Sequence, residues 1–110
     1  MERFQNEQEI EAVVMGFESC TTGVDDFSHL DHLTVAVWYL RDSTPEEAFQ
    51  KMCVGLLRFL DHHGVGRAKY DEALTMKWIR LIHQSIEAYP SLSLFEVTNL
   101  VVDRFAGSRL

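Results

Sequence analysis

The chain has 110 residues, the length of one domain, and its 46% hydrophobic and 25% charged residues are typical of a soluble globular protein. No apolar run reaches the roughly eighteen residues of a membrane span, and the N-terminal segment lacks the basic start and apolar stretch of a secretion signal. The net charge of −7, without a cluster of basic residues, argues against nucleic acid and anionic membranes as partners, and we expect a cytoplasmic protein.

Apolar residues recur at intervals of three and four rather than two, which predicts helices and no strands. The first helix is expected over about residues 6–20, and Gly23 follows its end. The second is expected over 28–42. It opens at Ser28 with Asp31 three residues on, a pattern typical of a capping box. This second helix is apolar nearly all round, so we expect it to be central in the fold.

The third helix, over 45–63, has the plainest start signal. Thr-Pro-Glu-Glu at 44–47 supplies an N-cap, a proline at the first helical position and a glutamate at the third, and Gly64 is a natural left-handed stop. The fourth helix is expected over 69–89, because Pro90 prevents its continuation.

The fifth helix is expected over 93–105, with Ser93 and Glu96 as its capping pair. The connections between helices are short, so neighbours should pack roughly antiparallel. The sequence therefore predicts an all-α fold, a compact bundle of about five helices forming a single domain over 1–110.

Several polar residues fall on or beside the predicted buried faces. His29 lies within about 40° of the core direction of its helix, and His32 lies on the flank of that direction. Asp71 lies within about 10–20° of the core direction of the fourth helix. Together with Glu18, which borders the first apolar stripe, these side chains are expected to converge. A buried carboxylate or imidazole needs a partner, because an unpaired polar group in the core is costly.

Each residue also has an ordinary structural explanation. Asp71 could be the N-cap of a helix that starts at Glu72. His29 could be a core histidine bonded to a carbonyl or to Asp71, and His32 a half-exposed packing residue. Cys20 and Cys53 lie on predicted buried faces without activating neighbours, so we expect free thiols and no covalent catalysis.

Three stretches of the sequence resemble motifs of a known protein family. They are F-S-H-L-D-H-L-T-V-A at 27–36, His63-Gly64, and Y-D-E-A-L-T at 70–75 followed by Trp78. They resemble a family of small all-helical bacterial proteins of uncharacterised function with the motifs F-x-H-x-x-H-L and Y-H-E-T-[IL]-T. This chain differs in carrying Asp71 where the family has histidine and Ala73 where it has threonine. The resemblance implies that His29, His32, position 71 and Glu72 act together, and it implies no particular activity.

Two kinds of function fit these residues. In the first, His29, His32 and Asp71 bind a divalent metal such as zinc or iron, or line a small-ligand site whose other residues are Tyr70, Glu72, Thr75 and Trp78. Whether such a site would catalyse a reaction is left open.

In the second kind of function, the chain is a non-enzymatic interaction or assembly module that can form a homo-oligomer. Its histidines and Asp71 then form a structural hydrogen-bond network. The apolar surface for a partner would come from residues that fall away from the predicted core stripes, namely Val35, Trp38, Tyr39 and Ile79.

Overall fold

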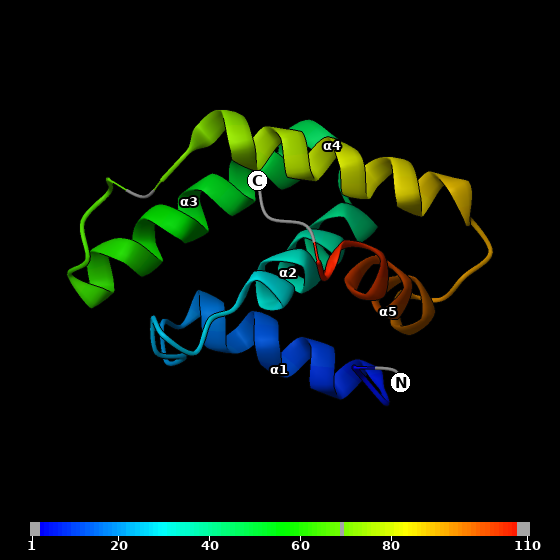
Figure 1. The fold of residues 1–110 in the computed structure, drawn as a ribbon, viewed down its shortest axis with the longest axis horizontal. Coiled ribbons are helices and arrows are strands. Elements are labelled where there is room, and N and C mark those ends of the chain that lie inside the picture. The colour runs from blue at the N-terminus through cyan, green and yellow to red at the C-terminus, as the bar shows by residue number, and fades with distance from the viewer. Residues whose placement is uncertain (1–2, 69, 108–110) are drawn as a thin grey trace.

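The computed structural model describes residues 3–68 and 70–107, and the regular structure in these ranges is entirely helical (Figure 1). In chain order the helices are α1 (Glu7–Glu18), α2 (His29–Arg41), α3 (Pro45–His63), α4 (Glu72–Ala88) and α5 (Leu94–Phe105). The Cα radius of gyration is 13.2 Å, as expected for a compact domain of this length. The predicted all-α bundle of five helices is confirmed.

The helix starts follow the predicted capping chemistry. Three helices begin with a capping box. The hydroxyl of the N-cap residue accepts a hydrogen bond from the backbone N–H of the residue three positions later, and the carboxylate of that later residue accepts one from the N-cap N–H. The three pairs are Ser28 with Asp31, Thr44 with Glu47, and Ser93 with Glu96. Helix α3 ends at Gly64, whose φ of 66° lies in the left-handed region that glycine adopts without steric cost.

The fourth helix begins later than predicted. Lys69, the predicted first residue, lies outside the described residues, and Tyr70 and Asp71 are not helical. The Asp71 side chain instead accepts a hydrogen bond from the backbone N–H of Leu74 at 2.9 Å, which makes it the N-cap. Glu72 is therefore the first helical residue.

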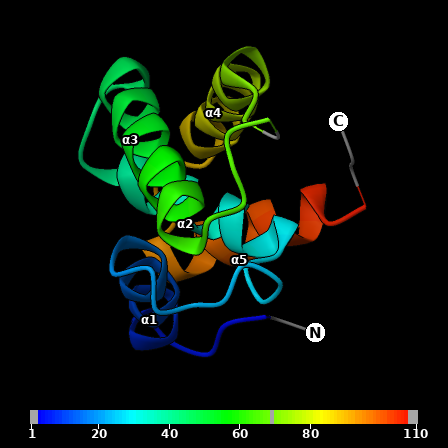
Figure 2. The ribbon, with the colours of Figure 1, turned by 90° about the vertical axis from the view of Figure 1, so that its left-hand side faces the viewer.

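Helices α3 and α4 lie together on one side of α2, and α1 and α5 lie on the other side. The two perpendicular views agree on this arrangement (Figures 1 and 2). Helix α2 contacts all four of the others, so it occupies the centre of the bundle as predicted. This central position brings the N-terminal turn of α2 between the α3–α4 pair and the end of α5.

The surface that was predicted for a partner is largely absent, because α2 has neighbours on every side. Val35 is fully buried, and Tyr39 and Ile79 are 7% and 1% exposed. Trp38 is half-buried, and the Arg41 guanidinium lies 5.2 Å from its ring centroid. The expectation that these four residues form an exposed apolar face is wrong, since three of them belong to the core.

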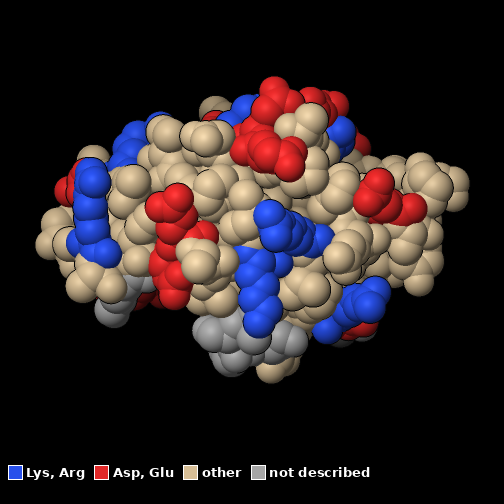
Figure 3. Space-filling model, turned by 90° about the horizontal axis from the view of Figure 1, so that it is seen from above, with Lys and Arg blue, Asp and Glu red and all other residues tan. Residues whose placement is uncertain are grey.

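No helix in the described ranges combines the length and the apolar character needed to cross a membrane. Cys20 is buried and Cys53 is half-buried, and both are free thiols as predicted. Seen from above, over α4, acidic and basic side chains lie in several small, separate groups across the surface (Figure 3).

Candidate functional site

A cavity of about 460 Å³ lies between α2, α3 and α4, and the two loops that precede α2 and α4 complete its wall. Most of the lining is apolar or aromatic. The polar lining side chains are His29, His32, Tyr70, Asp71 and Thr75. With Trp78, which also lines the cavity, these are six of the seven residues that the sequence predicts for a site. The seventh, Glu72, is exposed and does not line the cavity.

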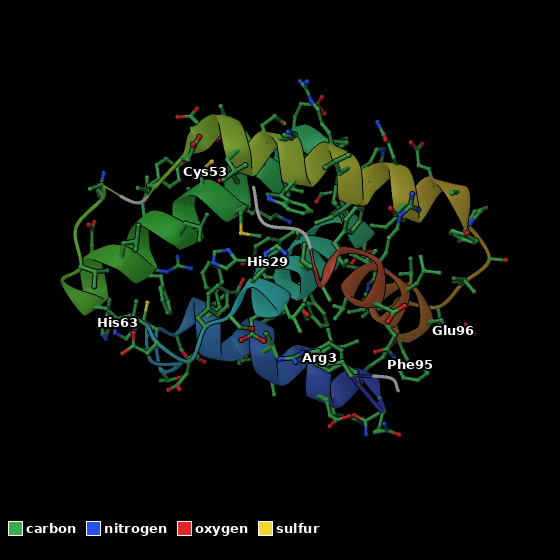
Figure 4. The ribbon with its side chains drawn as sticks, in the orientation of Figure 1. Arg3, His29, Cys53, His63, Phe95 and Glu96 are labelled. Atoms are coloured by element: carbon green, nitrogen blue, oxygen red, sulfur yellow. The ribbon has the colours of Figure 1, made fainter. Side chains whose placement is uncertain are left out.

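His29 is fixed by the end of α5. Its Nε2 lies 3.2 Å from the carbonyl oxygen of Phe105, and its ring meets Trp78 edge-on with the centroids 5.2 Å apart. A carbonyl oxygen only accepts, so Nε2 carries the hydrogen. In the Nε2–H tautomer, the Nδ1 atom is a hydrogen-bond acceptor. His29 lies near the centre of the molecule, on the first turn of α2 (Figure 4).

His32 presents a polar group that the described part of the protein does not pair. Its ring packs against Phe27, with the centroids 4.6 Å apart, and the hydrogen bonds formed around the start of α2 do not involve it. Burial, reinforced by the nearby His29, lowers the pKa of His32 to about 4 against a smaller opposing effect of Asp31. At neutral pH the ring therefore offers one donor and one acceptor to the cavity.

Asp71 lies at the rim of the cavity. The side chain is exposed, and its Oδ1 is occupied by the Leu74 N–H, while Thr75 donates its hydroxyl to the Asp71 carbonyl oxygen at 2.9 Å. The predicted position on the core face of the helix is wrong, because that face was computed for a helix that included residue 71. Asp71 and His29 have separate hydrogen-bond partners and form no dyad in the structure.

The three-ligand metal site suggested by the sequence is not assembled among residues 3–68 and 70–107. Within these ranges no three His, Cys, Asp or Glu side chains are grouped so that they could hold a metal ion. Glu18, the other carboxylate expected nearby, accepts a hydrogen bond from the Tyr39 hydroxyl at 2.6 Å and does not line the cavity.

Tyr70 lies near Cys53, a proximity that the sequence did not suggest. Burial raises the pKa of the Tyr70 phenol, and the neighbouring Cys53 thiol raises it further. Tyr70 belongs to the loop before α4, whereas Cys53 lies on α3 (Figure 4). The phenol therefore remains protonated well above neutral pH and can donate a hydrogen bond at the cavity wall.

Two further aromatic residues, Phe27 and Phe59, belong to the cavity wall. Their ring centroids are 5.2 Å apart, and Phe17 stacks on Phe27 from behind at 4.8 Å. Helical spacing marks such residues as buried but does not distinguish a core position from a cavity wall.

Comparisons with models of protein families, with curated proteins and with solved structures find no match to this chain. The resemblance to a bacterial helical family stays a prediction, and the function must be argued from the cavity itself.

Proposed function

We propose that this protein binds a small, largely apolar molecule in the cavity between α2, α3 and α4. The observation that carries the proposal is His32, a neutral imidazole without a protein hydrogen-bond partner in the described residues, on the wall of an otherwise mainly apolar cavity. His32 is half-buried and lines the cavity, so a ligand there can supply the hydrogen-bond partner that the described residues do not.

The size and lining of the cavity support the same function. Its volume of about 460 Å³ is within the usual range of small-molecule sites, which combine apolar walls with a few polar groups. The aromatic rings of Phe27, Phe59 and Trp78 offer flat apolar surfaces, while His29 Nδ1 and the Tyr70 hydroxyl offer an acceptor and a donor. A molecule with an apolar body and one or two polar atoms fits this pattern.

An assembly function has less support, because the large apolar side chains that are exposed do not form one face. Among the described residues they are scattered over α1, α3 and three connecting segments: Met15, Val24, Val54, Val65 and Tyr89. Exposed hydrophobic residues that occur singly are normal for a monomer.

The test is titration with N-phenyl-1-naphthylamine, a neutral probe whose fluorescence rises in apolar sites. We expect saturable binding of one probe per chain. Ala36, which lines the cavity and is 3% exposed, is replaced by phenylalanine to fill the space, and Ala36→Phe should bind the probe at least about tenfold more weakly.

Ala12→Phe is the matched control, because it makes the same substitution at an exposed position of α1 and should bind like the original chain. Circular dichroism checks that both variants are folded. Probe binding that is absent from the original chain, or equal in both folded variants, would contradict the proposal.

A further inference from the structure

The charge distribution around the cavity narrows the class of ligand. Asp71 is the only formally charged residue among the described residues that line it, and no described lysine or arginine does. A carboxylate or phosphate ligand would meet no basic partner there and would lie near a negative charge, whereas a cation would be attracted.

The N-termini of α2 and α4 do not reverse this preference for a cation. A helix N-terminus carries a partial positive charge, and both helices begin beside the cavity. Each start, however, carries its own carboxylate. Asp71 accepts from the Leu74 N–H. Asp31 accepts from the Ser28 N–H in its capping box and is also paired with Arg3 at 3.2 Å. The net charge at the N-terminus of α4 therefore stays negative.

The nearest described basic residue in the loop before α4 is already paired. Arg67 donates from Nη2 and Nε to the two carboxylate oxygens of Asp61, at 2.6 and 3.2 Å. Because the Arg67 guanidinium makes both hydrogen bonds to Asp61, Arg67 does not serve as a counter-ion for Asp71.

We propose that the ligand is a cationic amphiphile, with an apolar or aromatic body inside the cavity and a protonated amine at the rim beside Asp71. This inference rests on the proposed binding function. The amine stays at the rim because the exposed Asp71 carboxylate remains hydrated there, and the interior next to His32 and Phe27 takes the uncharged part. The Tyr70 ring, which also lines the cavity, adds a surface that can attract a cation.

Three compounds with the same apolar body test the proposal: 4-phenylbutylamine, 4-phenylbutanol and 4-phenylbutyrate. Their dissociation constants are measured by calorimetry at neutral pH and low salt. We expect the amine to bind roughly two- to fivefold more tightly than the alcohol, the range typical of an exposed ion pair, and the carboxylate to bind most weakly. Raising the salt concentration should reduce the advantage of the amine.

The variant Asp71→Asn removes the charge and keeps a good N-cap, so α4 should fold normally. It should abolish the advantage of the amine without changing the affinity for the alcohol. Glu72→Gln is the matched control, because it removes the neighbouring carboxylate that does not line the cavity, and it should retain most of the preference.

The outcomes separate the two proposals. If neither these compounds nor the neutral naphthylamine probe bind, the binding function itself fails. If the probe binds but the amine has no advantage over the alcohol, or Asp71→Asn keeps that advantage, only the charge inference fails. The charge inference would also be overturned if 4-phenylbutyrate bound most tightly of the three compounds and lost this affinity in the Lys69→Met variant.

Discussion

The side-chain amide of Asn99 makes two hydrogen bonds to the backbone of Phe4, which lies 95 positions earlier in the chain. Asn99 Oδ1 accepts from the Phe4 N–H at 2.9 Å, and Asn99 Nδ2 donates to the Phe4 carbonyl at 3.0 Å. The Phe4 side chain is only 4% exposed. One amide therefore satisfies both backbone groups of the residue that attaches the N-terminal segment to α5.

Replacing Asn99 with alanine should reduce the free energy of unfolding by about 2–3 kcal/mol, because it leaves a buried N–H and a buried carbonyl without partners. Urea unfolding followed by far-ultraviolet circular dichroism measures this change. Thr98→Val is the matched control at the adjacent position, where the fully buried hydroxyl has no hydrogen-bond partner in the described structure. That variant should be neutral or slightly more stable, and a loss of stability as large as that of Asn99→Ala would contradict our interpretation.

Gly55→Ala should destabilise the protein by about 1–3 kcal/mol, although alanine favours helices more than glycine does. A methyl group at Gly55 would lie 2.6 Å from Cε2 of Phe17, whose ring is fully buried and cannot move aside. Chemical denaturation measures the effect. In a Phe17→Leu background, where the ring is absent, Gly55→Ala should become neutral or stabilising; an unchanged cost there would exclude a clash with Phe17 as the cause.

The half-buried His32 should make stability depend on pH. Its pKa is lowered from 6.5 to about 4 in the folded protein, so the unfolded chain binds more protons between these values. Stability is therefore fully present above about pH 6.5 and falls as the pH drops toward 4, by up to about 3 kcal/mol.

His32→Phe removes the imidazole and should flatten this part of the profile. Free energies of unfolding at a series of pH values from 4 to 7 give the difference between the two proteins. Since other groups titrate equally in both, the difference isolates His32. Parallel profiles for the two proteins would refute the assignment.

The Tyr39–Glu18 hydrogen bond should produce an effect at alkaline pH. Burial, the hydrogen bond to Glu18 and the charge of Glu18 all raise the pKa of the Tyr39 phenol above its usual 10. The stability from this phenol is fully present below pH 10 and is lost as the pH rises further, because the unfolded chain releases its proton first.

Tyr39→Phe should cost about 1–2 kcal/mol at neutral pH, since the hydrogen bond involves a charged acceptor, and it should remove part of the alkaline dependence. Thermal unfolding at neutral pH and near pH 10.5 measures both effects. Glu18→Gln, which keeps an acceptor without the charge, should lose less stability at neutral pH than Tyr39→Phe. A larger loss in Glu18→Gln would show that the carboxylate acts through another contact.

Local signals in the sequence were sufficient to predict the helices. The residues of a capping box form their hydrogen bonds within one helical turn, so they lie close together in the sequence, as Thr44 with Glu47 and Ser93 with Glu96 do. The start of α4 had two interpretations, because Asp71 fits both a residue on the buried face and an N-cap. The structure confirms the alternative in which Asp71 is the N-cap and the helix starts at Glu72.

The sequence predicted which of these residues lie near one another but not how their polar atoms are arranged. His29, His32, Tyr70 and Trp78 do line one cavity. The alternative in which His29 bonds a backbone carbonyl is confirmed, but the identity of that carbonyl, at Phe105, has no signature in the sequence. The burial of Val35 was missed for a related reason, since the face of a single helix does not reveal how many neighbours will cover it.

The central position of α2 has a consequence for the synthesis of the protein. Helix α2 packs against α5, which leaves the ribosome after the other four described helices. Until that helix is available, no partial chain can bury every side of α2, and its apolar side chains remain available to other proteins in the cell. Nascent chains that have not yet completed α5 should therefore be the form of this protein most dependent on chaperones.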